Sequence, residues 1–331
     1  MNRKILAFIF LITSSIFAQT EMSDIAVAPG AFSRMGFGAR GMGMGNAMSA
    51  VMTGNVVSYY NPALSAFQDG SSFQTSFSFL SLDRSLNFLN FTKKFNFGKV
   101  VVDGETRPRS VAGFSVGVIN SGVSGIQERD NQGNLVGDVS TSENQFFIGV
   151  ANRFSQKLAI GIAFKFYYYS LYENISATSL GFDIGALYMF NENVTLSLMM
   201  SDLNAKYKWD TSDLYGSNGL STTDRFPILK KIGLSYRFDD PKIIVAVELE
   251  NSNAHTNYLR GGAEYNVFEG LFVRGGVDKY DLNNSDFPAR PSLGFSYFYV
   301  WDNIVFGVDY AFVSEPYSSA DQHIVGLNIK F

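Results

Sequence analysis

Apolar and polar residues alternate along the chain from residue 71 onward, in segments of about ten residues that Gly, Asn, Asp and Pro separate. In residues 158–169, for example, Ile162 and Phe164 share one face, and Ala163 and Lys165 share the other. Because successive side chains of a β-strand point to opposite faces, this pattern predicts strands with one apolar face. The other face carries small, amide and charged residues.

The composition of the two faces favours a membrane barrel over a soluble β-sandwich. A sandwich usually has Lys and Glu on its solvated faces, whereas the polar faces here are rich in Gly and Ser. Only 17% of the residues are charged, and 15% are aromatic. Beyond residue 18 no apolar run approaches the ~18 residues of a membrane-spanning helix, whereas a membrane-spanning strand needs only ~9–11. We therefore predict an all-β fold, a 14-stranded antiparallel transmembrane β-barrel.

The connections between the predicted strands differ in length at the two ends of the barrel. With the N-terminus in the periplasm, the inner turns are mostly short and the outer connections, such as 121–142 and 204–226, are longer, as is typical of outer-membrane barrels. The inner connection 96–109 is an exception. The alternation slips near Leu89-Asn90, which suggests a bulge in the second strand. The predicted strands are 71–80, 84–95, 110–120, 143–153, 157–171, 179–190, 193–203, 227–238, 242–251, 257–267, 270–280, 290–300, 303–314 and 322–331.

Residues 1–18 have the composition of a secretory signal peptide. Arg3 and Lys4 precede the apolar run 5–17, which is too short for a membrane anchor, and cleavage is expected after Ala18. The chain has no cysteine, which excludes disulfides and a lipid anchor, and its 26 basic and 30 acidic residues do not indicate a nucleic-acid partner. We therefore expect export to the outer membrane of a Gram-negative-type bacterium, with outer-membrane lipid around residues 71–331.

Residues 19–70 are predicted to form a separate segment, a hatch inside the barrel. They contain a Gly- and Met-rich stretch over 30–45, a predicted short helix over 46–51 and a turn at Asn61 and Pro62. Glycines permit a tight backbone path where side chains would not fit.

Three motifs of this segment resemble the start of the PorV/PorQ-type outer-membrane proteins, within the wider FadL-like barrel group. The resemblance implies a fourteen-stranded barrel with a hatch in its lumen. The family members serve type IX secretion through contacts with the translocon or with cargo proteins, and the wider group moves small hydrophobic molecules. The acidic pair that usually follows the small-residue helix is absent, and residues 50–55 stand there. The motif residues are Gly38-Ala39-Arg40, Gly41-Met42-Gly43 and Tyr60-Asn61-Pro62-Ala63, and Arg34 lies in the same stretch.

Charged residues on the polar strand faces should point into the lumen, because they would be costly against lipid. We expect them to pair with one another and with the hatch arginines Arg34 and Arg40, and a role in binding substrate is the alternative. The candidates are Lys165, Asp183, Glu248, Arg260, Arg274 and Asp278.

Two surface features complete the candidate sites. The outer connection 204–226 carries Tyr207, Trp209, Leu214 and Tyr215, which are either a partner surface or interfacial aromatics. The terminal Phe331, on the apolar face of the last strand, resembles the signal that the barrel-assembly machinery recognises.

The sequence indicates no catalytic or cofactor site. The two histidines, His255 and His323, have no further ligand at metal-binding spacing, and a hydrolase built on Asp321 and His323 is a weak alternative. We therefore expect no enzyme and no cofactor.

The hatch separates the two leading functions, an accessory component of type IX secretion and a channel for hydrophobic molecules. A channel should show an apolar pocket of several hundred Å3 along residues 31–45, whereas a secretion component permits a sealed hatch. We expect the sealed hatch because glycines favour close packing. The side chains that would line such a pocket are Phe32, Met35, Phe37, Met42 and Met44.

Overall fold

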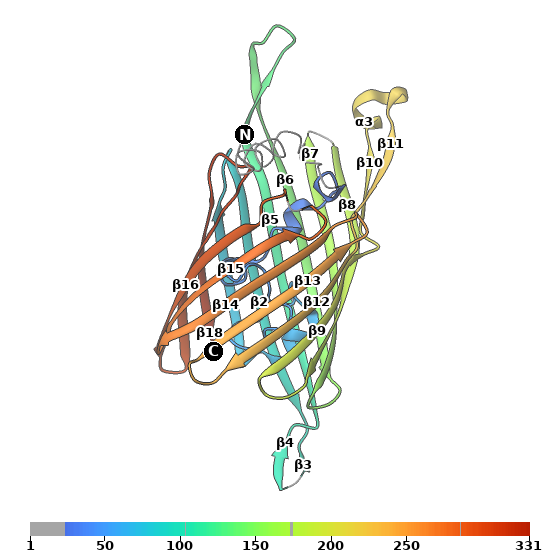
Figure 1. Ribbon diagram of the computed structural model, residues 1–331. Coiled ribbons are helices and arrows are strands. Elements are labelled where there is room, and N and C mark those ends of the chain that lie inside the picture. Colours follow the sequence, from blue (N-terminus) through green and yellow to red (C-terminus); the bar gives the residue numbers. More distant parts are fainter. Residues whose placement is uncertain (1–23, 103, 173–174, 285) are drawn as a thin grey trace, which may run out of the picture.

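The computed structural model describes residues 24–331 except 103, 173–174 and 285, so the predicted signal peptide lies outside the described residues. The chain forms a closed barrel of fourteen antiparallel strands, which confirms the predicted fold (Figure 1). The first strand, β1 (Ser71–Phe79), pairs with the last, β18 (Gln322–Lys330), and Ser71 and Phe331 exchange backbone hydrogen bonds of 2.7 and 3.0 Å. Within the described ranges, no helix is long and apolar enough to cross a membrane.

The barrel strands agree with the predicted spans to within a few residues, except in one long hairpin. The predicted loop 121–142 is wrong, because strand pairing continues through most of it to a turn at 130–134. The remaining barrel strands are β2 (Arg84–Phe97), β5 (Ser110–Arg129), β6 (Leu135–Arg153), β7 (Leu158–Tyr172), β8 (Ile175–Met189), β9 (Val194–Leu203), β12 (Leu229–Phe238), β13 (Ile243–Ser252), β14 (Asn257–Phe268), β15 (Leu271–Asp281), β16 (Arg290–Trp301) and β17 (Ile304–Val313).

Two further hairpins project from opposite ends of the barrel (Figure 1). The hairpin of β3 (Val100–Val102) and β4 (Glu105–Arg107) lies in the connection 96–109, which explains why this inner connection is long. The hairpin of β10 (Lys206–Asp210) and β11 (Ser221–Arg225) fills the connection 204–226, with the helices α3 (Ser212–Tyr215) and η4 (Gly216–Asn218) at its tip. We call the end with β3 and β4 the short-turn end, and the opposite end the long-hairpin end.

The predicted bulge near Leu89-Asn90 is wrong. Strand β2 pairs with β1 and β5 in continuous register. The apolar pattern slips there because Leu86 and Phe88 point into the lumen and pack against the hatch, where Phe88 lies 5.0 Å from the ring of Phe37. Apolar residues therefore occupy the inner face of this strand as well as the outer one.

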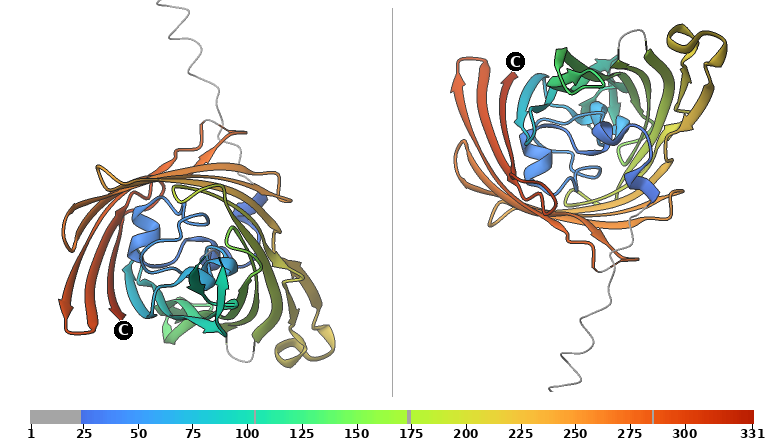
Figure 2. Two further views of the ribbon diagram at one scale, coloured as in Figure 1. Left: turned by 90° about the horizontal axis from the view of Figure 1, so that it is seen from below. Right: turned by 90° about the horizontal axis from the view of Figure 1, so that it is seen from above.

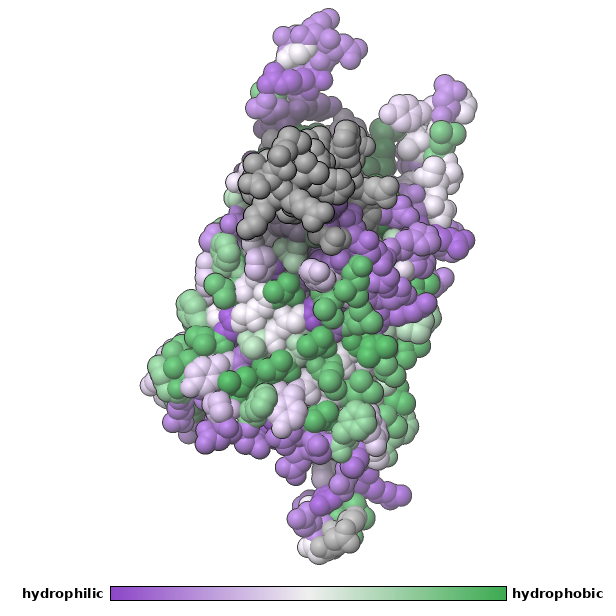
Figure 3. All heavy atoms as spheres, in the orientation of Figure 1, coloured by the Kyte–Doolittle hydropathy of each residue, from purple (hydrophilic) through white to green (hydrophobic). Residues whose placement is uncertain are grey.

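The two faces of the wall otherwise separate as the alternation predicts. Phe164 and Leu180 are 59% and 68% exposed on the outside, whereas Lys165 and Asp183 are buried inside. Figure 3 shows the result as a hydrophobic band across the visible side of the barrel, between hydrophilic ends. A band of this kind matches the apolar surface that a bilayer requires.

The described part of the hatch lies inside the ring of strands (Figure 2), and Figure 1 shows that it passes from the long-hairpin end to the short-turn end, where β1 begins. Its elements are η1 (Asp24–Ala26), η2 (Ala31–Arg34), α2 (Gly38–Gly43) and η3 (Pro62–Phe67). The helix predicted over 46–51 is wrong, since the helix forms earlier, within the glycine stretch. The helix ends at Gly43, and Gly45 and Asn46 then both have a φ of 60°, outside the helical conformation. The side chain of Asn46 donates a 3.0 Å hydrogen bond to Asp278 of the wall.

Candidate functional site: the hatch and the lumen

The glycine motif gives helix α2 room to pack against its neighbours. A Cβ atom on Gly41 would overlap the ring of Tyr60, whose hydroxyl accepts a 2.9 Å hydrogen bond from the Phe37 N–H and lies 2.8 Å from Asn46 Oδ1. Gly38 has a φ of 68°, a conformation that side chains disfavour. The motif therefore specifies a close approach of backbone to side chains.

Arg40 connects the hatch to the wall. Its Nη2 and Nε atoms donate hydrogen bonds of 2.7 and 2.9 Å to the two carboxylate oxygens of Glu264 on β14. Its Nη1 donates to the carbonyl oxygens of Thr53 and Asn55 at 2.7 and 3.2 Å. A Cβ atom on Gly54 would lie 2.7 Å from Nη1, so glycine makes room for the guanidinium. One predicted hatch arginine thus pairs with the wall as expected.

Arg34 was expected to pair with the wall, but the structure places it differently. Its guanidinium donates to the carbonyl oxygens of Pro29, Ala28 and Ile25 at 2.6, 3.0 and 3.4 Å. It forms no ion pair within 4 Å among the described residues. Arg34 therefore organises its own segment, because its guanidinium joins three carbonyl groups of residues 25–29.

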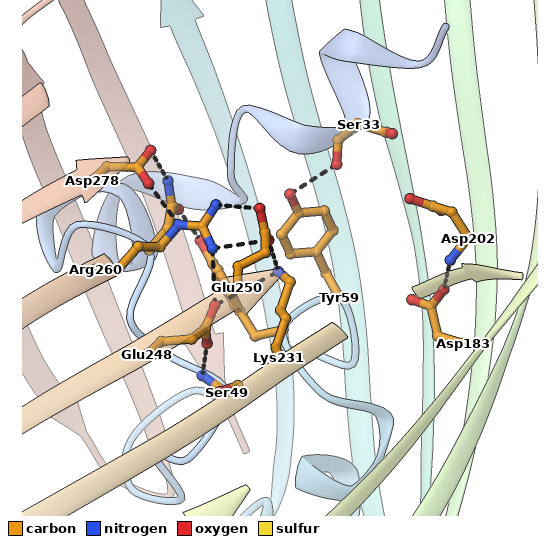
Figure 4. Close-up of polar contacts among 12 residues, drawn as sticks. Ser33, Ser49, Tyr59, Asp183, Asp202, Lys231, Glu248, Glu250, Arg260 and Asp278 are labelled. Carbon is orange, nitrogen blue, oxygen red and sulfur yellow. Dashed lines mark hydrogen bonds and ion pairs between the residues drawn. The ribbon is translucent and has the colours of Figure 1, made fainter. Parts of the chain in front are cut away.

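A buried cluster of charges lies on the inner face of strands β12 to β15 (Figure 4). Arg260 contacts the carboxylates of Glu248, Glu250 and Asp278 at 3.2, 2.9 and 2.6 Å. Lys231, which the sequence analysis did not single out, lies 3.2 Å from Glu250. The cluster reaches the hatch through Asn46 and through the Ser49 N–H, which donates to Glu248 at 3.3 Å. The expected pairing of the lumen charges is therefore present.

A second cluster lies on the next three strands of the wall, β7 to β9. Lys165 Nζ lies 2.8 Å from Asp183 and 2.9 Å from Asp202, and Tyr167 donates a 2.5 Å hydrogen bond to Asp202. Asp202 was missed by the sequence analysis because it follows the alternating part of β9 and has a φ of 61°. That backbone conformation turns its carboxylate toward Lys165 instead of toward solvent.

The hatch packs tightly in the lumen along residues 31–45. Phe32, Phe37, Met42 and Met44 are all buried, and Met35 packs against the same core. In the described part of the chain, the cavities of about 430, 710 and 510 Å3 have none of these five side chains in their lining. The side chains pack tightly as expected, with Phe37 near Phe88 on the wall.

Asn61 and Pro62 anchor the other end of the hatch. The side chain of Asn61 accepts a 2.9 Å hydrogen bond from the Ala63 N–H and so caps η3, with Pro62 at the first helical position. A Cβ atom on Gly161 of the wall would lie 2.5 Å from Ala63 N, so glycine permits this contact. Beyond η3, Asp69 accepts a 2.7 Å hydrogen bond from Lys330, which lowers the pKa of Asp69.

A cavity of about 430 Å3 lies beneath the hatch, at the short-turn end. Its apolar walls are Phe272, Phe298, Ile243 and Ile244 together with Phe238 from the end of β12. Its polar lining includes Arg40, Glu264 and Arg274 on the hatch side and Asp239 and Lys242 of the β12–β13 turn. No sequence pattern predicted this cavity, because Phe272 and Phe298 point inward, against the usual polarity of a lumen.

Arg274 is the predicted lumen charge that contacts the cavity. Its Nη2 donates a 2.6 Å hydrogen bond to Ser296, and its Nε lies 3.1 Å from Glu264. Its Nη1 is buried and has no hydrogen-bond partner among the described residues. Gly43 and Gly294 make room for the side chain, since Cβ atoms there would lie 3.0 Å from Cδ and 3.2 Å from Cγ.

The four residues of the predicted partner loop do not all lie on one exposed surface. Tyr207 is not exposed as expected but buried, 4.9 Å from the ring of Phe226, because β10 folds back against β8. Trp209 is half-buried, whereas Leu214 and Tyr215 are exposed at the hairpin tip. A role for these residues in binding a partner stays a prediction.

The terminal and rim residues show no catalytic arrangement. Phe331 is 56% exposed, and its role in barrel assembly stays a prediction. The Asp321 carboxylate accepts from the Glu315 N–H, whereas His323 contacts Tyr310, so no hydrogen bond joins the two among the described residues. The described part of the chain also holds no group of three residues suited to a metal.

Comparison with solved structures identifies proteins of similar fold. No protein-family model and no curated protein matches the chain. The P. putida toluene transporter TodX is 14% identical over 89% of this chain and 97% of that chain, with a TM-score of 0.54. The TodX deltaS2S3 mutant, a monoaromatic hydrocarbon channel, is 15% identical over 89% and 97%, with a TM-score of 0.56. A Pseudomonas aeruginosa FadL homologue is 14% identical over 89% and 98%, with a TM-score of 0.51.

These structures share an architecture with this chain at low sequence identity. Their fold agrees with the FadL-like group that the hatch motifs indicate. They give no support for the narrower PorV/PorQ family. The chain therefore has the fold of the FadL-like outer-membrane barrels.

Proposed function

We propose that the chain is an outer-membrane channel for small hydrophobic molecules, with its hatch closed in this conformation. The cavity beneath the hatch carries the proposal. At about 430 Å3, with Phe272, Phe298 and Ile244 in its lining, it has the size and the largely apolar character of a small-molecule site. The TodX structures, whose names describe a toluene transporter and a monoaromatic hydrocarbon channel, have the same fold and support this direction.

A closed hatch requires a movement before a molecule can pass. The hatch is held by polar contacts with the wall, through Arg40, Asn46 and Ser49, in addition to apolar packing. Polar contacts can be exchanged for contacts with water more readily than a continuous apolar core can be opened. If the protein is a channel, uptake of hydrophobic molecules should therefore depend on movement of the hatch.

A reversible crosslink tests this dependence. Ser49 of the hatch and Ser197 of β9 have hydroxyl oxygens 2.7 Å apart, so Ser49→Cys with Ser197→Cys can form a disulfide in a chain without other cysteines. Thr92→Cys with Ser115→Cys is the matched control, because these side chains, 3.0 Å apart, both belong to the wall. Uptake of radiolabelled toluene by cells that carry each variant is measured with and without reductant.

We expect oxidation to stop uptake through the hatch-to-wall pair and reduction to restore it. The wall-to-wall pair should transport under both conditions. Equal uptake by the oxidised and reduced hatch pair would contradict passage through the lumen.

A PorV/PorQ-type role in type IX secretion is the second candidate, favoured by the hatch motifs and by the exposed tip of the β10–β11 hairpin. This role needs protein contacts and no opening of the hatch. Replacing Leu214 and Tyr215 with Ser should then reduce delivery of cargo to the cell surface, while the crosslinked hatch should leave delivery unchanged. Normal delivery by the tip variant would contradict this role.

A further inference from the structure

The cavity beneath the hatch holds a positively charged group that the fold leaves without a full set of partners. Arg274 is 5% exposed, and its Nη1 donates no hydrogen bond among the described residues. A buried N–H without an acceptor costs free energy that a ligand oxygen would recover. The neighbouring Arg40 differs, because all three of its nitrogens have acceptors. Arg237, which also lines the cavity, has an Nε without a hydrogen-bond partner, but its side chain is 41% exposed and lies 3.6 Å from Asp239. Arg274 is therefore the fully buried arginine at the cavity with an N–H that lacks an acceptor.

The walls next to Arg274 suit a flat apolar body. Phe272 and Phe298 meet edge to face with their ring centres 5.7 Å apart, and both line the cavity. Edge-to-face and offset contacts are the favoured geometries between aromatic rings. A ligand ring can therefore pack on this pair while a charged group reaches toward Arg274.

The charges around the short-turn end add to the attraction for anions. The cavity reaches Lys242 and Arg237 at this end. A second, open cavity of about 710 Å3 on the other side of the same end has several cations and one acid in its lining. Cationic walls raise the local concentration of anions. The cations that line this second cavity are Lys94, Arg107, Arg109, Arg153 and Lys157.

We propose that the cavity binds an aromatic monocarboxylate, with the carboxylate on Arg274 and the ring on Phe272 and Phe298. Neighbouring atoms cover Nη1 in this conformation, so the Arg274 side chain must shift to present it to the cavity. The carboxylate then supplies the acceptor that Nη1 lacks, and planar guanidinium groups match carboxylates well. The inference deepens the proposed function and rests on it for the route by which the ligand arrives. Binding itself requires no transport, so it is measured separately.

The test measures dissociation constants of purified barrel in lipid nanodiscs for 2-naphthoate and for its neutral analogue 2-naphthamide. We expect 2-naphthoate to bind at least about tenfold more tightly, as a charge-assisted hydrogen bond warrants. Arg274→Gln should weaken 2-naphthoate binding at least about tenfold and leave 2-naphthamide nearly unchanged. Ile244→Trp fills the cavity without changing a charge and should abolish binding of both probes.

Arg153→Gln is the matched control, since it removes one positive charge at the same end but lines the other cavity. Its affinity for 2-naphthoate should change far less than that of Arg274→Gln, because Arg153 adds only to the general attraction and does not contact the ligand. Equal binding of the two probes, or binding that survives Ile244→Trp, would overturn the proposal. An equal loss in Arg153→Gln and Arg274→Gln would also overturn it, because general charge and not this site would then attract the anion.

The 2-naphthoate binding test and the hatch crosslink test can fail independently of each other. Binding of 2-naphthoate with no effect of the hatch crosslink on toluene uptake would retain the site and reject the channel. Uptake that depends on the hatch, without 2-naphthoate binding, would retain the channel and reject this ligand class.

Discussion

Removal of the Arg40 guanidinium should loosen the hatch while the barrel stays folded. In Arg40→Met the hatch loses both hydrogen bonds to Glu264 and the contacts to the carbonyl groups of Thr53 and Asn55. Breaking a buried ion pair costs about 3–5 kcal/mol when one charge is left without a partner. Glu264 keeps Arg274 at 3.1 Å, so the lower value applies, about 3 kcal/mol.

Amide hydrogen exchange followed by mass spectrometry measures this loss directly. A change of about 3 kcal/mol in the free energy of local opening corresponds to about a hundredfold faster exchange. We expect that acceleration in residues 38–55 and unchanged exchange in strands such as β7, whose backbone hydrogen bonds lie in the wall. The comparison within one molecule separates opening of the hatch from unfolding of the barrel.

Arg34→Met is the matched control, since Arg34 is also a hatch arginine but donates only to carbonyl groups of its own segment. It should accelerate exchange near residues 25–35 and leave 38–55 protected. If Arg40→Met leaves residues 38–55 as protected as in the unchanged chain, the ion pair with Glu264 does not hold the hatch, and the reasoning fails.

Three further predictions concern the wall and its assembly. Ile162→Arg on the lipid face should cost about 2–4 kcal/mol of barrel stability and weaken the folded band on unboiled gels; an unchanged folded band together with its loss in Ala163→Arg would mean that the two faces are inverted. Deletion of Phe331 should slow assembly, measured as outer-membrane yield over time, and normal yield would argue against an assembly signal. Gly45→Val should displace the hatch, because a Cβ atom there would lie 2.6 Å from Val277 N, and protease cleavage of residues 38–55 in the folded barrel should increase; resistance equal to that of the unchanged chain would contradict the close packing.

The sequence by itself specified the strands, their number and the direction of their faces. A repeat of two residues has only one structural reading over segments of this length, and the cost of placing Lys165 or Asp183 in lipid decides which face is inside. The same reasoning anticipated that the lumen charges would pair, because buried charges without partners are costly. These inferences succeed because they depend on local pattern and on solvation alone.

The tertiary structure decided which charges meet, and where the lumen is empty. Arg40 and Glu264 are 224 residues apart in sequence, and only closure of the barrel around the hatch brings them together. The bulge predicted at Leu89-Asn90 failed for a related reason, since apolar residues on the inner face pack against the hatch and disturb the alternation. The helix predicted over 46–51 is replaced by α2 over 38–43, and the positive φ of Asn46 accompanies a contact of its side chain with Asp278.

The cavity beneath the hatch is the feature that the sequence pattern predicts least. Phe272 and Phe298 alternate with outward residues just as polar lumen residues do, so no periodic pattern marks them as inward aromatics. A Cβ atom on Gly307 would overlap the ring of Phe298, so a glycine on the neighbouring strand permits its position. Periodicity assigns a side chain to a face, but the space left between a wall and a hatch depends on the packing of both, which is settled only when the whole chain is folded.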